Sequence, residues 1–420
     1  MKTTPWWFAA AALVLLAPRH GRADGCFVSV KTTEVGQSKS LVSSPKQEAI
    51  LATDGQTVQV VLRTHFNAGP KELGWVVPVP GEPDDVAKAD DAIFDRLDAM
   101  TAPTFVQVER IGHGGGFMFG CGTVAWSGDG GLERTGMPLA VQVEKAGRAG
   151  IFDFQVLAAQ SPQDLLLWLD QHNYSPPEGA AKTFAPYVAK GWHWLAVRVR
   201  AEEAHRPTLA PHPITYRYKS SSLVFPLAIS SLSAAEETEI VLYVVGAGYF
   251  GPAGWTGCTS EELAAGGIAE QKLSPSGTNY EELLRRKARS LAGRLLVTEF
   301  AQPWQMFGAS ATMGRRFDDV IESNLLASIG GRQALTRLRA CVRREQMVED
   351  ISLEPKPRAP QVHNQIRFSP PAPAQAGGAA LGAGALSACA AGGLAPRRRR
   401  AAKALAALLV ALGLALLTVI

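Results

Sequence analysis

The residues best suited to covalent chemistry in this 420-residue chain are its cysteines: Cys26, Cys121, Cys258, Cys341 and Cys389. Cys121 lies near the end of the glycine-rich segment 112–122 (GHGGGFMFGCG), whose backbone N–H groups are able to approach a substrate closely. A cysteine nucleophile needs a base beside it. The candidate catalytic pair is therefore Cys121 with His113 or with His193.

The cysteines also have a structural interpretation, which we favour because cysteines of exported chains usually form disulfides. The four cysteines upstream of the tail allow three pairings. Pairing Cys26 with Cys121 and Cys258 with Cys341 keeps each closed loop within one half of the body. No CxxC motif occurs, so neither a thiol redox centre nor a zinc site is expected, and no metal or cofactor is predicted.

Histidines and aromatic residues offer weaker candidates for a site. His193 stands on a predicted strand, on the face of Leu195 and Val197, which indicates a partly buried, hydrogen-bonded side chain rather than a metal ligand. An aromatic set has the composition of a sugar- or peptide-binding groove, although such residues more often fill a core. It comprises Trp168, Tyr174, Trp192 and Trp194.

The N-terminus carries the pattern of a secretory signal peptide over residues 1–23. Lys2 provides the positive charge, and residues 6–17 (WWFAAAALVLLA) form an apolar run too short to span a bilayer. The small residues Gly21 and Ala23 precede a predicted cleavage site between Ala23 and Asp24. The sequence therefore predicts an exported protein of the cell envelope, in the periplasm or at the cell surface.

The C-terminus, residues 397–420, combines four arginines, Arg397 to Arg400, with the apolar run 404–420. Seventeen residues lie at the lower limit for a membrane-spanning helix. If the body is exported, arginines before such a helix contradict the positive-inside rule. Three solutions remain open: the rule is overridden, residues 376–394 enter as the first limb of a hairpin, or the run is a removable sorting tail.

Charge is distributed unevenly. The chain has a net charge of +4, but three basic residues stand in the first 23 positions and five in the last 24, with no acid in either segment. Residues 24–396 therefore carry a net charge of −4. Nucleic acid is not an expected partner, because binding phosphate needs a concentrated cationic face.

The predicted body, residues 24–350, has an α+β pattern. Alternating apolar residues predict antiparallel or mixed sheets early in the chain, and the continuously apolar segment 240–245 predicts a central strand. Helices are expected late. Ser161-Pro162-Gln163-Asp164 is a helix start, and Thr278-Asn279-Tyr280-Glu281 resembles a capping box. Further helices are predicted over 317–328 and 332–348, and residues 351–396, rich in Pro, Ala and Gly, predict an extended linker.

Several motifs along the body resemble a known family. They are the Gly74-Trp75-Val76-Val77-Pro78-Val79-Pro80 segment, Trp168-Leu169 before Asn173-Tyr174, Trp194-Leu195-Ala196-Val197, and Leu223-Val224-Phe225-Pro226. Together they resemble the bacterial family called domain of unknown function 2330, over roughly residues 24–345. The resemblance implies an exported, envelope-associated protein and supplies no reaction. The segment Ser387 to Gly393 before the apolar run is also similar to sorting tails of delta-proteobacterial surface proteins.

These observations favour an envelope-tethered binding or surface-structural module that is not an enzyme. Its membrane contact would be the C-terminal helix, and its other partner an envelope protein or polymer. The alternative is a cysteine-dependent hydrolase or transferase that acts on envelope polymer or peptide through Cys121.

Overall fold

The computed structural model describes residues 26–30, 44–63, 73–90, 92–107, 141–199, 212–304, 321 and 323–368. Several predicted features lie outside these residues: the signal peptide with its cleavage site between Ala23 and Asp24, the glycine-rich segment with His113 and Cys121, and the tail with Cys389 and Arg397 to Arg400.

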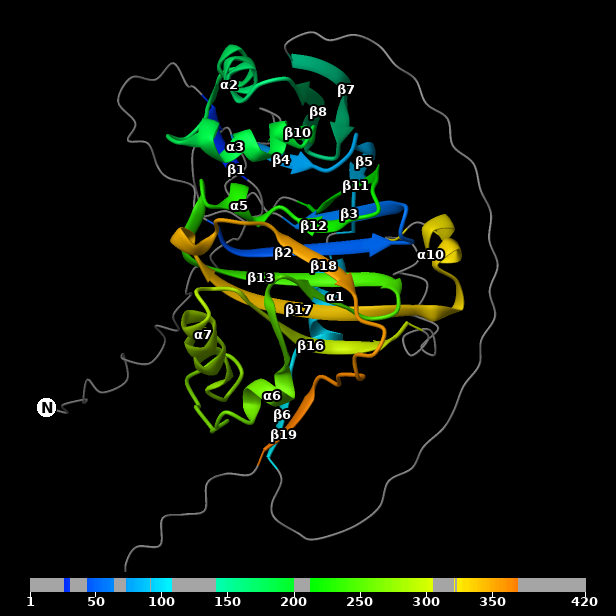
Figure 1. Cartoon of the computed structure of the whole chain (residues 1–420), viewed down its shortest axis with the longest axis vertical. Coiled ribbons are helices and arrows are strands. Elements are labelled where there is room, and N and C mark those ends of the chain that lie inside the picture. Colours follow the sequence, from blue (N-terminus) through cyan, green and yellow to red (C-terminus); the bar gives the residue numbers. More distant parts are fainter. Residues whose placement is uncertain are drawn as a thin grey trace, which may run out of the picture. The chain divides into compact units, whose positions relative to one another are not determined.

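The largest sheet has eight strands in the order β15-β16-β17-β13-β2-β3-β11-β5 (Figure 1). Neighbouring strands are antiparallel, except that β13 runs parallel to β2 and β15 parallel to β16. The strands are β2 (Ser44–Thr53), β3 (Thr57–Arg63), β5 (Asp84–Lys88), β11 (Ile214–Lys219), β13 (Ala234–Ala247), β15 (Thr256–Thr259), β16 (Leu295–Pro303) and β17 (Gln333–Arg343).

A six-stranded antiparallel sheet has the order β7-β8-β10-β4-β1-β9. Its strands are β1 (Cys26–Val30), β4 (Leu73–Val79), β7 (Val141–Ala149), β8 (Phe152–Ala159), β9 (Tyr174–Ser175) and β10 (His193–Val199). Two smaller sheets complete the described part of the chain. They are β12-β18-β14, formed by Leu223–Phe225, Ile351–Pro355 and Phe250–Ala253, and the parallel pair of β6 (Thr104–Gln107) and β19 (Gln365–Phe368).

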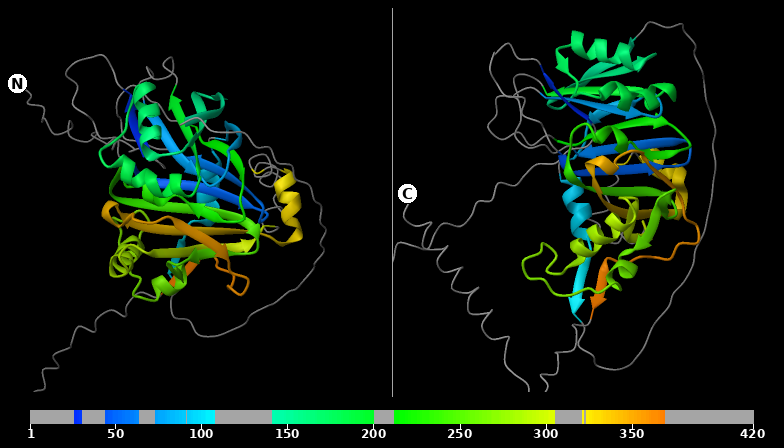
Figure 2. Two further views of the ribbon diagram at one scale, coloured as in Figure 1. Left: turned by 45° about the horizontal axis from the view of Figure 1, so that its top comes forward. Right: turned by 60° about the vertical axis from the view of Figure 1, so that its left-hand side comes forward.

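The helices complete a layered body. They are α1 (Ile93–Thr101), α2 (Pro162–Gln171), α3 (Ala180–Ala189), α5 (Leu227–Ser230), α6 (Ser260–Ala264), α7 (Tyr280–Ser290) and α10 (Ser323–Ile329), with 3-10 turns at Gly330–Arg332 and Arg344–Gln346. Helices α2 and α3 cover one face of the six-stranded sheet, and that sheet's other face packs on the eight-stranded sheet. Helices α1, α10, α6 and α7 cover the far face of the eight-stranded sheet (Figure 2).

The central strand predicted over residues 240–245 is confirmed. It lies within β13, between β17 and β2, and all six of its residues are buried. Its side chains alternate between two cores: Ile240, Leu242 and Val244 face the six-stranded sheet, while Val241, Tyr243 and Val245 face α1 and α10. A strand buried on both faces needs no polar alternation, which explains the uninterrupted apolar run.

The helix predicted over residues 332–348 is wrong, because the segment forms β17. Leu338, Ala340 and Val342 enter the core between the sheets. Arg337 and Arg339 alternate with them and occupy the opposite face, where both guanidinium groups pair with Glu299. Arg337, Arg339 and Arg343 alternate in the sequence with Leu338, Ala340 and Val342, which is the period-two pattern of a strand, and the helix prediction missed this pattern. The predicted order of strands early and helices late is therefore also wrong, although the α+β class is confirmed.

The body continues past residue 350, where an extended linker was predicted. Strand β18 joins β12 and β14, and Ile351 and Leu353 are buried in the core between the sheets. Strand β19 pairs with β6, and its Ile366 packs beside α7. The predicted C-terminal membrane helix lies outside the described residues, and no helix within them is long and apolar enough to cross a bilayer.

Candidate functional site

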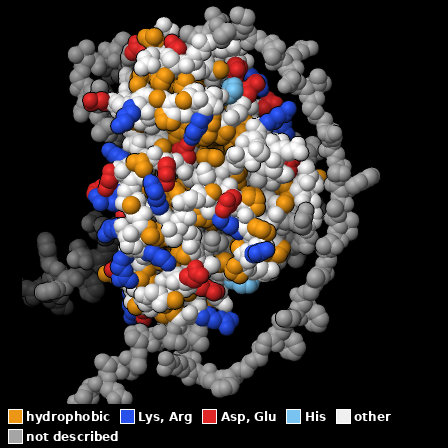
Figure 3. Space-filling view, viewed as in Figure 1, with side chains coloured by type: hydrophobic (Ala, Val, Ile, Leu, Met, Phe, Trp, Pro, Cys, Tyr) orange, Lys and Arg blue, Asp and Glu red, His pale blue; other side chains and the backbone are white. Residues whose placement is uncertain are grey.

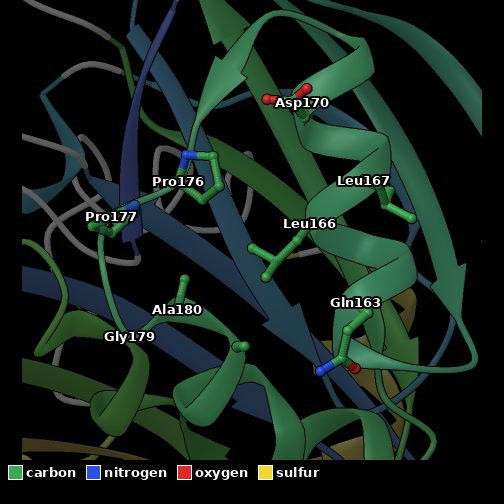
Figure 4. A pocket seen from close by; sticks show the side chains of 9 residues that line it. Gln163, Leu166, Leu167, Asp170, Pro176, Pro177, Gly179 and Ala180 are labelled. Carbon is green, nitrogen blue, oxygen red and sulfur yellow. The ribbon is translucent and has the colours of Figure 1, made fainter.

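A groove lies on the outer layer of the six-stranded sheet, between helices α2 and α3 (Figure 4). Helix α2 begins where the sequence predicts, with Ser161 as cap. The backbone N–H of Asp164 donates to Ser161 Oγ at 3.1 Å, and Pro162 occupies the first turn. Leu165, Trp168 and Leu169 face the sheet and are buried. The remaining face of the helix is left to form the groove wall.

Helix α3 forms the opposite wall. It begins after Gly179, whose φ of 81° is a left-handed conformation that glycine adopts without a steric penalty. Phe184 and Tyr187 are fully buried against the sheet, and the Phe184 ring lies 4.9 Å from the ring of Trp194. These aromatic contacts fix the position of α3 relative to the sheet and therefore the width of the groove.

The groove has a volume of about 610 Å³, and apolar side chains form most of its lining. Leu166 points across it toward Ala180, and Pro176 and Pro177 close one side (Figure 4). Leu167 on the rim is 60% exposed. The complete lining is Gln163, Leu166, Leu167, Asp170, Pro176, Pro177, Gly179, Ala180 and Ala181. An apolar hollow with a few polar groups at its edge suits an apolar side chain of a partner.

The aromatic residues considered as a groove lining instead lie behind this groove. Trp168, Tyr174 and Trp194 are buried in the core under α2 and α3, and Trp192 is partly buried against Tyr187, with ring centroids 5.1 Å apart. The core-filling interpretation of these aromatics is therefore confirmed. Sequence analysis missed the groove because its lining is small and aliphatic; the available signal was the pair Pro176-Pro177 between two short amphipathic helices.

The predicted disulfide between Cys258 and Cys341 does not form, and both residues are thiols. Cys258 lies on β15 and Cys341 on β17, with β16 between them. Strands two positions apart in a sheet are separated by roughly 9–10 Å, whereas a disulfide needs Cα atoms within about 7 Å. The predicted partner of Cys26, Cys121, lies outside the described residues, so that pairing stays a prediction.

The thiols in the described residues are not activated for nucleophilic attack. Burial raises the pKa of Cys341 to about 12, and the nearby Glu237 carboxylate raises it as well. Burial also raises the pKa of Cys258, and the attraction of Lys287 opposes this effect. Cys26 is completely buried in the core behind the groove, and burial raises its pKa too. A thiol with a raised pKa carries little thiolate near neutral pH.

His193 is partly buried, with 22% of its side chain exposed, as the sequence indicates. Its Nε2 lies 3.2 Å from Oε2 of Glu144. Glu144 stands at a β-bulge, where the register of β7 against β8 shifts between Val143 and Lys145, and a bulge redirects a side chain that a regular strand would point elsewhere. Within the described residues, the partner of His193 is therefore the Glu144 carboxylate and not a cysteine.

Metal binding has no support from the part of the chain that the structure describes: no three His, Cys, Asp or Glu side chains converge there. Charge is also dispersed on the face of the body that Figure 3 shows. Lys and Arg side chains alternate with Asp and Glu over the face seen in Figure 3. That face therefore presents mixed charges and no platform of a single sign.

The fold and the groove together define a layered α+β body with an apolar surface groove. Burial raises the pKa of each cysteine thiol among its described residues. The profile of the bacterial family "Uncharacterized protein conserved in bacteria (DUF2330)" matches residues 26–263. The chain belongs to this family, and the resemblance noted in the sequence is confirmed. The matched residues include both walls of the groove.

Other comparisons add little. No curated protein matches the chain. A solved structure titled "Crystal structure of baculovirus P35" is similar over 56% of this chain and 72% of that chain, at 12% sequence identity and a TM-score of 0.28.

Proposed function

We propose that the protein is an exported module, tethered to the cell envelope by its C-terminal segment, that binds an apolar element of an envelope partner in the α2–α3 groove. The groove carries this proposal, because it is a preformed apolar hollow on the surface with the exposed Leu167 on its rim. A concave apolar hollow with a few polar groups at its edge is the default candidate for a binding site.

Support for export comes from the signal-peptide pattern of residues 1–23, and support for the tether from the apolar run 404–420. Strand β1 begins at Cys26, two residues after the predicted new N-terminus at Asp24. Cleavage at that position would leave the whole of β1 in the body, so the proposed processing is compatible with the fold.

One labelling experiment tests both parts of the proposal. Leu167→Cys places a thiol on the groove rim, and Val348→Cys places one at a position that is 69% exposed and does not line the groove. A maleimide that does not cross membranes is applied to cells with a permeabilised outer membrane and an intact inner membrane and to purified protein, and each labelled peptide is quantified by mass spectrometry. We expect Val348→Cys to be labelled in both samples and Leu167→Cys to be protected in cells only.

The outcomes separate the two parts. If neither position is labelled in cells that retain an intact inner membrane but a permeabilised outer membrane, the body is not exported. If both positions are labelled equally in cells and in purified protein, the groove is vacant in the envelope and the binding role is wrong. Sedimentation of membranes from cells with and without residues 397–420 tests the tether, which predicts that only the full chain sediments.

A further inference from the structure

The most exposed large apolar side chain described in the structure is Leu273, with 99% of its surface accessible. It stands in the loop between α6 and α7. A leucine side chain at such a position contributes no hydrophobic stabilisation to the fold, because it stays in contact with water. The residues beside it are Lys272, which is exposed, and Ser274.

The loop that presents Leu273 is closed by hydrogen bonds on both sides of it. The Gln271 N–H donates to Gly277 O at 2.8 Å, and the Ser274 N–H donates to Gln271 O at 3.0 Å. At the base, the Asn279 side chain accepts from the Ala269 N–H at 2.8 Å and donates to Gly267 O at 3.0 Å. The loop therefore holds Leu273 in a defined position. We call Leu273 and Lys272 together the leucine knob.

The knob and the α2–α3 groove lie on opposite outer layers of the body. Helices α6 and α7 cover the eight-stranded sheet, whereas α2 and α3 cover the far side of the six-stranded sheet. Figures 1 and 2 show α2 and the α6–α7 segment at opposite ends of the body. The knob of one molecule is therefore unable to reach its own groove, but it is free to enter the groove of another copy.

The two surfaces are complementary in chemistry. The groove is lined by leucine, proline and alanine, which suit a leucine side chain. Asp170 lines the groove as its charged residue, and Lys272 adjoins Leu273. A lysine beside the inserted leucine would face an acid of opposite charge, which favours this partner over a like-charged one.

We propose that copies of this protein associate head to tail, with Leu273 of one copy seated in the α2–α3 groove of the next. Such a contact is heterologous. When two copies join, one knob and one groove stay vacant, so the assembly extends as a row and does not close as a two-fold dimer. The proposal rests on the proposed function and identifies the groove's partner as a second copy. A single inserted leucine gives a weak contact, and tethering to one membrane raises the effective concentration of the copies.

Complementation between variants of the full chain tests this arrangement. Leu273→Ser removes the knob, and Leu167→Lys places a positive charge at the groove rim, where it repels Lys272. Both positions are exposed, so neither change disturbs the core. We expect each variant alone to lose self-association by roughly tenfold or more, from the lost burial of one leucine. A mixture of the two variants retains one intact knob and one intact groove and should form heterodimers.

Val348→Ser is the matched control, because it removes an exposed apolar side chain outside both surfaces. Association of every variant is measured in membranes by co-purification of two differently tagged copies, and the contact is located by a photo-crosslink from a benzophenone residue at position 273 of an otherwise native chain. We expect the crosslink to fall in α2 or α3 of the second copy, and Val348→Ser to leave the yield of co-purification unchanged. The complementation arm is read by co-purification of the two tags.

Several results would overturn the proposal: no crosslink, crosslinks to other proteins or to lipid alone, no recovery in the mixture of variants, or an equal loss in Val348→Ser. Failure of the tether is distinguishable, because it appears as loss of the chain from sedimented membranes, whichever crosslinks form. A chain that sediments but forms no crosslink at position 273 retains the proposed tether and contradicts only the head-to-tail contact.

Discussion

Arg337 donates from Nε to Oε2 of Glu299 at 2.8 Å, and both side chains are almost completely buried under helix α1. The same guanidinium lies 2.8 Å from Oδ1 of Asp98 and donates to the hydroxyl of Tyr243 at 2.9 Å. Glu299 also accepts from the hydroxyl of Tyr280 at 3.1 Å. These polar contacts connect α1 and α7 to the middle of the eight-stranded sheet, in addition to the apolar contacts that both helices make with it.

Removing one partner of this buried pair should be costly. We expect Glu299→Ala to lower the free energy of unfolding by about 3–5 kcal/mol, because Arg337 and Arg339 both lose their buried counter-charge and Arg337 keeps only the partly exposed Asp98. The double variant Glu299→Met with Arg337→Met should recover most of this loss, since apolar side chains of similar volume often replace a buried pair without a penalty. Urea unfolding followed by circular dichroism measures both. Additive losses in the double variant would contradict the pairing.

The cysteines provide a chemical test of the fold. Because burial raises the pKa of Cys258 and raises that of Cys341 to about 12, both thiols should resist iodoacetamide at pH 8 and react only after unfolding. Peptide mass spectrometry of native and unfolded protein measures this difference. A disulfide between the two, detected before reduction, would contradict the strand order β15-β16-β17.

Asp350 should make stability depend on pH. Burial raises its pKa above the ordinary value, while its Oδ1 accepts from the Tyr187 hydroxyl at 2.6 Å and from the Ala228 N–H at 3.0 Å. The folded state therefore binds this proton more tightly than the unfolded chain, so the contribution of Asp350 is greatest below pH 3.8 and is lost as pH rises through the raised pKa.

Asp350→Asn retains an oxygen that accepts both hydrogen bonds and has no charge to bury. We expect it to be at least as stable as the native protein at pH 7 and to lack the Asp350 part of the pH dependence. Asp350→Ala is the matched control and should cost about 1–3 kcal/mol at pH 7, because both donors lose their acceptor. Thermal unfolding between pH 4 and pH 8 compares them. Equal losses in the two variants would show that the charge itself stabilises the fold.

A glycine turn gives a steric prediction. Gly150 has a φ of 58° and lies against the ring of His212, whose Nε2 accepts from the Ile151 N–H at 3.0 Å. A methyl group at position 150 would collide with that ring. We expect Gly150→Ala to cost at least about 2 kcal/mol, more than the same change at Gly191, where φ is also positive but space is open. Equal costs at the two positions would contradict the described contact.

Local signals in the sequence predicted the elements that local chemistry determines. Ser161 and Pro162 gave the start of α2, and the apolar run 240–245 gave the central strand. The capping box expected at Thr278 to Glu281 does not form, because the Asn279 side chain closes the preceding loop instead. The start of α7 was therefore predicted correctly, but the capping box on which that prediction depended is absent.

Features that depend on distant contacts were not predictable. Arg337 and Arg339 resemble a solvated helix face until β16 brings Glu299 beside them. The α2–α3 groove and the leucine knob depend on which small aliphatic residues stay exposed after packing, and periodicity does not contain that information. Strand β18 is proline- and charge-rich at its end, so its pairing with β12 and β14 also escaped prediction.

Intact-mass and N-terminal analysis of the protein isolated from the cells that make it tests the central claim of export most directly. We predict that the chain is recovered from the membrane fraction and begins at Asp24, with residues 1–23 removed. A full-length chain that begins at Met1 and is recovered from the cytosol would contradict it.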